Sequence, residues 1–200
     1  MEKQMPDLQG EQTAGSSENT GKAGVCGKTA AWAALQDELT GALIGLARAV
    51  DGNEVLKTAE TDQLVIKGLF TTVTNANFNE ETVRILLKKV RDEIHRIVPD
   101  CSVCASPCGR TSEYDMREVW KAGEDIRSLK LLLLLGIRGV AAYAYHAMLQ
   151  GYTDEKVNAF FYKALYMIGY DGEAADLLSV VLEAGKVSFQ MEKAFRALPV

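Results

Sequence analysis

The sequence predicts an all-α fold: two antiparallel three-helix bundles joined by a cysteine-containing loop, with a disordered N-terminal tail. Apolar residues recur at three- and four-residue spacing along most of the chain, which is typical of helices with one buried face. Capping residues precede several of these stretches, and glycine or proline follows them. No stretch alternates apolar and polar residues as a strand would.

Three helices are expected in the first half. The first is capped by Thr29 and runs to about Val50. Its expected apolar face consists of Leu35, Leu39, Leu43, Leu46 and Val50. The second starts near Thr61 and stops before Asn75, and the third is capped by Asn79. The apolar face of the third consists of Val83, Leu86, Leu87, Val90, Ile94 and Ile97.

The sequence of the second half predicts one short helix and three long ones. The short helix covers about 116–121, and a long helix follows from about Glu124 to Gln150. Thr153 is expected to cap the next helix, which reaches about Ile168, and Gly172 to precede the last. The predicted division is 1–23 as a flexible segment, 24–98 as the first bundle, 99–112 as the cysteine loop and 113–200 as the second bundle.

The composition excludes several classes of partner. Apolar residues make up 48% of the 200 residues, enough for a sizeable core. The net charge is −5 without a basic stripe, so no nucleic acid is expected. Lys130 and Arg138 bracket the apolar run 131–137, which is far shorter than the roughly 20 residues of a membrane span. No secretory segment is recognisable, so a cytoplasmic location is expected, with cysteines that stay reduced or bind metal.

The four cysteines are the candidate metal ligands. Cys101, Cys104 and Cys108 follow the pattern C-x2-C-x3-C, which lets one loop present three thiolates to a single metal or cluster. Cys26 is the only cysteine left to serve as a fourth ligand. The sequence therefore predicts either an iron–sulfur or zinc site on these four residues, or a loop of reduced cysteines without metal.

Other motifs give weaker evidence of function. Gly27-Lys28-Thr29 is similar to the end of a phosphate-binding loop, but Lys22 stands where that loop needs its first glycine and no strand precedes it. His95 and His146 each lie on a predicted helix without a second ligand at metal-binding spacing. Both are interpreted as hydrogen-bonded core or boundary residues. No catalytic residue and no further cofactor-binding residue is assigned.

Several segments, in order, resemble one known family. They are Gly24-Val25-Cys26-Gly27-Lys28-Thr29, Leu35-Gln36-Asp37, residues 68–78, the loop 101–110, residues 124–130 and residues 136–147. This series resembles the N-terminal helical domain of the hybrid-cluster proteins, also called prismane proteins or hydroxylamine reductases. The resemblance covers about residues 24–185.

The resemblance implies a fold and a chemistry. In the family, two three-helix bundles precede two α/β domains, and a cubane [4Fe-4S] cluster passes electrons to a hybrid cluster that reduces hydroxylamine or nitric oxide. Three of the four cubane cysteines are replaced here, because Asp7, Gly10 and Thr20 stand in their places and only Cys26 is kept. The α/β domains that supply the hybrid-cluster ligands are absent from these 200 residues.

Three functions are therefore weighed. The chain is expected to be the helical domain of a hydroxylamine reductase relative, with a family role in electron transfer and no catalysis of its own. Its partners would be the α/β hybrid-cluster domains or a redox partner protein. One alternative is a standalone iron–sulfur or zinc protein that uses the four cysteines. The other is a helical module that binds a partner without redox chemistry.

Overall fold

The computed structural model describes residues 29–73, 79–99 and 113–198. These residues form only helices, as the sequence predicts, with no strand among them. The elements are α1 (Ala30–Val50), the short 3-10 helix η3 (Glu54–Leu56), α2 (Ala59–Thr71), α3 (Glu80–Ile97), α4 (Arg117–Lys121), α5 (Glu124–Leu149), α6 (Glu155–Ile168) and α7 (Ala174–Arg196).

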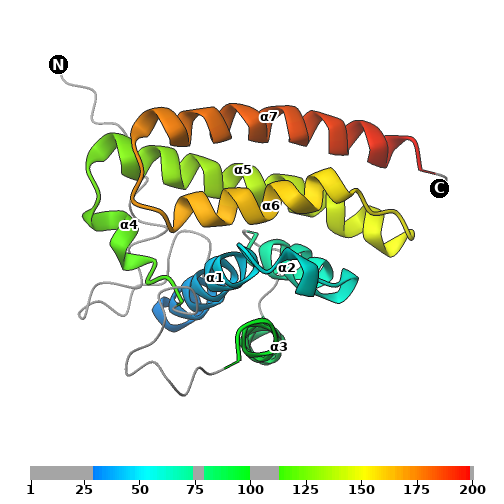
Figure 1. Ribbon diagram of the computed structural model, residues 1–200, viewed down its shortest axis with the longest axis horizontal. Coiled ribbons are helices and arrows are strands. Elements are labelled where there is room, and N and C mark those ends of the chain that lie inside the picture. Colours follow the sequence, from blue (N-terminus) through cyan, green and yellow to red (C-terminus); the bar gives the residue numbers. More distant parts are fainter. Residues whose placement is uncertain (1–28, 74–78, 100–112, 199–200) are drawn as a thin grey trace.

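The last three long helices lie side by side, and each runs opposite to the one before it (Figure 1). Helices α1, α2 and α3 lie below these three helices in the view of Figure 1, and α3 is seen nearly end-on, so it crosses α5–α7 at a large angle. Contacts of α1 with α6 and of α2 with α5 join the two groups. The division of the chain into two antiparallel bundles stays a prediction.

Two predicted helix starts are confirmed by their hydrogen bonds. The Thr29 side chain accepts from the Trp32 backbone N–H at 3.1 Å. The Asn79 side chain accepts from the backbone N–H groups of Glu81 and Thr82 at 3.0 and 3.3 Å. Each interaction satisfies donors that have no partner within the first turn. Gly52, at φ 77°, supplies the left-handed turn that follows α1.

Two other predicted starts are shifted by a few residues. Helix α2 is capped by Thr58 rather than beginning near Thr61, because the two threonines form a reciprocal capping box. Helix α6 is capped by Asp154 rather than Thr153, since the Asp154 carboxylate accepts from the backbone N–H groups of Lys156 and Val157. A negative cap also complements the positive end of the helix dipole.

Helix α1 is buried on almost every side, which the prediction of a single apolar face missed. Every residue from Leu39 to Ala47 is buried. Helices α2, α3 and α6 surround it, and the chain after the cysteine segment lies against Gly41 and Gly45. A helix in contact with neighbours on all sides is the centre of a core rather than its edge. The buried apolar side chains form one continuous cluster that includes residues from α1 to α7.

Helix α5 is the one described helix that is long and apolar enough to cross a membrane. This is weak evidence for a membrane span, because core helices of water-soluble proteins share the same composition. Lys130 and Arg138 interrupt it, and α5 packs against α2, α4, α6 and α7. Of its most apolar window 39% is buried, so α5 is covered by these helices on one side and exposed on another.

Replacement of a central α1 side chain tests this packing. Leu39 is fully buried, so Leu39→Ala is expected to lower the free energy of unfolding by about 2–5 kcal/mol. Ile85→Ala on α3 is the control, since Ile85 is 49% exposed and should lose well under 1 kcal/mol. Urea unfolding followed by circular dichroism measures both. Equal losses in the two variants would show that α1 is not central.

Candidate functional site

The predicted metal ligands Cys26, Cys101, Cys104 and Cys108 lie outside the described residues. What the structure does describe is the backbone on either side of them. Thr29 caps α1 three residues after Cys26, and Glu113 follows Cys108 by five residues. The candidate site is therefore built from the groups that fix these flanking positions.

The chain that leaves the cysteine segment is fixed on α1 by backbone contact. The Tyr114 N–H donates to the Gly41 carbonyl at 3.1 Å, although Gly41 lies inside a helix. A Cβ atom at Gly41 would lie 2.1 Å from the Tyr114 carbonyl oxygen, and one at Gly45 would lie 3.4 Å from the Glu113 Cα. Only glycine at position 41 permits this approach. The two glycines, one turn apart, therefore form the seat for residues 113 and 114.

Charged groups reinforce the same anchor. The Arg91 guanidinium on α3 binds Glu113 through two nitrogens, at 2.5 and 2.9 Å, and donates to Glu38 on α1 at 2.7 Å. The Glu113 carboxylate raises the pKa of Arg91 above its usual value, and Glu38 adds to the effect. A two-nitrogen contact fixes orientation as well as position. The anchor thus joins α1, α3 and the start of the second half.

The anchors restrict where Cys26 and Cys108 can meet. Thr29 and Gly45 are sixteen residues apart on α1, which corresponds to about 24 Å along the helix axis. The three residues from Cys26 to Thr29 and the five from Cys108 to Glu113 span at most about 27 Å when fully extended. A shared metal site is therefore within reach of both segments.

The Tyr114 ring lies close to two cationic groups. The Arg48 guanidinium lies 5.4 Å from the ring centroid and the Lys130 ammonium 5.6 Å. Arg48 also donates to the Gly169 carbonyl. Lys130 is only 2% exposed, and its nearest carboxylate is that of the fully exposed Asp171, at 3.8 Å. Burial lowers the pKa of Lys130 and raises that of Tyr114. Cation–π contacts compensate in part for the buried positive charge.

A second polar cluster joins α1, α2 and α5. The half-buried Arg138 on α5 donates from Nε to the Thr72 hydroxyl at 3.1 Å and from Nη2 to the Thr40 hydroxyl at 3.4 Å. Thr40 in turn donates to the Gln36 carbonyl at 2.9 Å. Burial lowers the pKa of Arg138 to about 10, while the nearby Asp37 carboxylate opposes that shift.

Asp37 is the ionisable partner of Arg138. Burial raises the Asp37 pKa to about 6, against an attraction to Arg138 that lowers it. Asp115 adds a smaller repulsion that also raises it. A carboxyl group that titrates near neutrality beside a buried guanidinium is the kind of pair that occurs at functional sites and in structural networks alike. Here it lies in the contact between the two groups of helices.

Asp62 holds α2 against α6. It accepts from the Tyr162 hydroxyl at 2.8 Å, from the Asn158 side-chain amide at 3.2 Å and from Lys57 at 2.9 Å. Burial and the Asp62 carboxylate raise the pKa of Tyr162. A cavity of about 330 Å³ opens beside this cluster, lined by Ala47, Val50, Glu54, Lys57, Tyr162 and Tyr166 among others.

The two histidines are placed differently from the prediction. His146 and His95 are both exposed rather than buried or at a boundary. His146 contributes ring contacts with Phe70 at 5.6 Å and Phe195 at 6.3 Å. Its position on the outer side of α5 follows from that helix having an uncovered face, which periodicity alone does not reveal.

Sequence reasoning did not select Gly41, Asp37, Tyr114, Lys130 or Arg138 for a role at this site. The signal for the two cations is that each interrupts an otherwise apolar helix, where a charge needs a partner. The glycine pair one turn apart, Gly41 and Gly45, also signals a close backbone contact in a helix. Asp37 lies in a motif quoted for the family resemblance, but its partner could not be predicted, because Arg138 lies 101 residues further along the chain.

Comparison with known proteins supports the family resemblance over most of the chain. A sequence model of the Prismane/CO dehydrogenase family matches residues 13–198. The chain belongs to this family. The match extends beyond residues 24–185, the range over which the sequence resembles the family. A hydroxylamine reductase of Thermodesulfovibrio yellowstonii is 36% identical over 193 residues, covering 84% of this chain and 35% of that protein.

Two further hydroxylamine reductases show the same pattern. The protein of Chlorobaculum tepidum is 35% identical over 174 residues, covering 81% of this chain and 32% of that protein. The protein of Clostridium perfringens is 36% identical over 200 residues, covering 90% of this chain and 36% of that protein. The chain therefore spans about a third of the length of these Prismane/CO dehydrogenase relatives.

The family implies an iron–sulfur cluster. Across residues 29–73, 79–99 and 113–198, no group of three His, Cys, Asp or Glu side chains is arranged to hold a metal ion. The described residues therefore do not fit such a cluster. The assignment of Cys26, Cys101, Cys104 and Cys108 as its ligands stays a prediction, because these residues lie outside the described part of the chain. The comparisons give no support to zinc.

Gly41→Ala tests the seat for Tyr114. The added methyl group would collide with the Tyr114 carbonyl, a backbone atom, so a loss of more than about 2 kcal/mol in the free energy of unfolding is expected. Gly139→Ala on α5 is the matched control, because nothing lies within 4 Å of its Cβ position. It should gain about 0.5–1 kcal/mol from helix propensity. A gain in both variants would refute the close approach.

Asp37→Asn tests the buried carboxyl. The folded pKa of about 6 exceeds the usual 3.8, so ionisation costs folding energy once the pH rises through this range. The contribution of Asp37 to the native stability should therefore fall between about pH 4 and pH 6. Asp37→Asn should remove this fall and be about 1–3 kcal/mol more stable at pH 7, with little difference at pH 4.

Chemical unfolding at pH 4, 5, 6 and 7 gives the measurement. Asp92→Asn is the control, since Asp92 forms an exposed pair with Lys88 at 2.6 Å and should change stability by less than about 0.5 kcal/mol at every pH. A parallel pH profile for the unmodified protein and Asp37→Asn would show that Asp37 ionises normally.

Proposed function

We propose that this chain is the helical electron-transfer module of a hydroxylamine-reductase-type system, and that it does not reduce hydroxylamine or nitric oxide by itself. The proposal rests on the small share of its relatives' length that this chain covers. The chain matches hydroxylamine reductases at about 35% identity, but over only 32–36% of their length. The greater part of those enzymes has no counterpart in these 200 residues.

The described helices support a role as a framework. One continuous apolar cluster runs through α1 to α7, so the module has a core of its own. Gly41, Gly45 and Arg91 hold the chain that follows the cysteine segment at a fixed place on α1. A redox group held between Thr29 and Glu113 would thus be carried on rigid elements, which favours a fixed transfer distance.

The redox group itself depends on the four cysteines. A bound iron–sulfur cluster supplies one-electron transfer, with thiolates as its ligands. The role of Arg91 and Tyr114 in this proposal is to position the segment that holds Cys101, Cys104 and Cys108. Direct ligation by the described residues plays no part in it.

Anaerobic reconstitution with iron and sulfide tests the proposal. The unmodified chain is expected to develop visible charge-transfer absorption and to retain iron after desalting. Cys104→Ser should lose both, whereas Ser102→Ala in the same loop should keep both. The reconstituted chain alone should not consume hydroxylamine with a reduced viologen dye as donor.

Two results would contradict it. One is unmodified chain that retains no iron and shows no charge-transfer band. The other is hydroxylamine consumption by the chain alone that Cys104→Ser does not abolish.

A further inference from the structure

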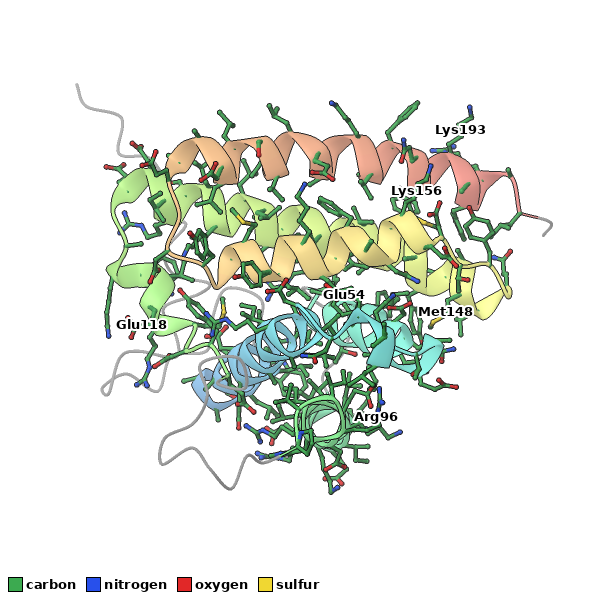
Figure 2. All side chains as sticks on the ribbon, viewed as in Figure 1. Glu54, Arg96, Glu118, Met148, Lys156 and Lys193 are labelled. Atoms are coloured by element: carbon green, nitrogen blue, oxygen red, sulfur yellow. The ribbon has the colours of Figure 1, made fainter. Side chains whose placement is uncertain are left out.

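The cavity beside Asp62, here called the α1–α6 cavity, has no part in the function proposed above. It occupies about 330 Å³, and three elements line it: α1 up to its C-cap Asp51, η3 with its C-cap Lys57, and one side of α6. Figure 2 shows Glu54, the first residue of η3, between α6 and the α1–α2 pair. This volume is at the lower end of the range for pockets that bind small organic molecules.

Apolar and aromatic side chains form much of the wall of the cavity. Its apolar members are Ala47, Val50, Ala159 and Met167. Two tyrosine rings of α6 complete the wall, and both have partners that hold them. The Tyr162 hydroxyl donates to Asp62 at 2.8 Å, and the Tyr166 ring stacks on Tyr170 with the centroids 6.0 Å apart. Aromatic rings that are already fixed lose little entropy when a ligand packs against them.

The two lysines in the lining are already paired with carboxylates outside it. Lys57 Nζ lies 2.9 Å from an oxygen of Asp62, and Lys163 Nζ lies 2.6 Å from an oxygen of Glu183. Asp62 and Glu183 are not among the lining residues. An anionic ligand would therefore have to displace one of these carboxylates before it could bind an ammonium group.

The two carboxylates in the lining are not paired in this way. Within the described part of the chain, neither Asp51 nor Glu54 forms an ion pair, and both are exposed. Hydrogen bonds from the backbone N–H groups of Glu54 itself and of Gly52 lower the pKa of the Glu54 carboxyl, so it is ionised at neutral pH. Asp51 caps the C-terminus of α1, where the helix dipole is negative. The cavity therefore favours a positive charge at this end.

We propose that the α1–α6 cavity binds a small organic cation, namely an ammonium ion that carries an aromatic group. The aromatic group packs against Tyr162, Tyr166 and the apolar wall, and the ammonium group lies at Asp51 and Glu54. A neutral molecule of the same shape gains only the contacts with the wall, whereas a carboxylate meets like charges. Two exposed carboxylates alone attract an ammonium ion only weakly, so the wall is needed as well. This inference does not depend on the proposed function, since it involves neither iron nor the cysteines.

Titration of the full chain with 3-phenylpropylammonium tests the proposal, with binding followed through the backbone amide signals in nitrogen-15 NMR spectra. Saturable shifts are expected at lining residues such as Ala159 and Tyr166. Two molecules of similar shape separate the contribution of charge from that of apolar contact. The neutral 3-phenylpropanol should bind about fivefold more weakly, and the anionic 3-phenylpropanoate at least about tenfold more weakly.

Removal of the two carboxylates tests the role of charge. The double variant Asp51→Asn/Glu54→Gln should bind 3-phenylpropylammonium about fivefold more weakly and 3-phenylpropanol within about twofold of the unmodified chain. Glu80→Gln/Glu81→Gln is the matched control, because it removes the same charge from exposed positions on α3. It should leave the affinity for both molecules within about twofold.

Filling the cavity tests the role of the wall. Ala159→Phe places a ring in the cavity and should abolish the binding of both molecules. Ala175→Phe on α7 is the control, since it adds the same ring outside the lining and should bind both normally. Both alanines are exposed, so both variants should fold, as their circular dichroism and melting will show.

Several outcomes would overturn the proposal. They are no saturable shift with 3-phenylpropylammonium, shifts confined to residues away from the lining, and equal affinity for the cation, the alcohol and the carboxylate. Undiminished binding of the cation by Asp51→Asn/Glu54→Gln or by Ala159→Phe would also overturn it. Tighter binding of 3-phenylpropanoate would show that a lysine leaves its carboxylate to bind an anion, and the cavity would then take the opposite class of ligand.

Discussion

The close approach of Tyr114 to Gly41 is the constraint on which the rest of the structure depends. It brings the polypeptide that follows the cysteine segment onto the central helix, and from that point the chain enters α4 and α5. A side chain at position 41 would push this segment outward by more than an ångström. The contacts of Arg91 and of the cations near Tyr114 form only when residues 113 and 114 lie against α1. The two groups of helices thus meet around a backbone contact rather than around a large side chain.

Polar groups at that meeting point set its orientation. Arg138 reaches from α5 to hydroxyl groups on α1 and α2, and Asp62 on α2 is held by Asn158 and Tyr162 of α6. Apolar packing is tolerant of small rotations, whereas a hydrogen bond is lost when its geometry changes. These contacts give the interface between the helix groups a defined arrangement. They also give the cations Lys130 and Arg138 of α5 polar or aromatic partners at that meeting point.

The sequence predicted the helices well because local chemistry decides them. Thr29 and Asn79 cap α1 and α3, as predicted from their residue types. The six predicted apolar positions of α3 are all buried. It did not predict that α1 would be buried on all sides, nor the partners of Asp37 and Arg138, because those facts depend on residues about a hundred positions away. The family could be inferred from ordered motifs, and the match over residues 13–198 confirms it. The ligand assignment to the four cysteines stays a prediction, since those residues lie outside the described part of the chain.

The central position of α1 has a consequence for biosynthesis. Its Ile44 and Arg48 contact Gly169, and the arginine and glycine are 121 residues apart. During translation α1 therefore emerges with its apolar surface uncovered long before α6 exists, and closure of so distant a contact is slow in folding. The nascent polypeptide should be a client for chaperones that shield hydrophobic segments at the ribosome, and its yield in a heterologous host should depend on their supply.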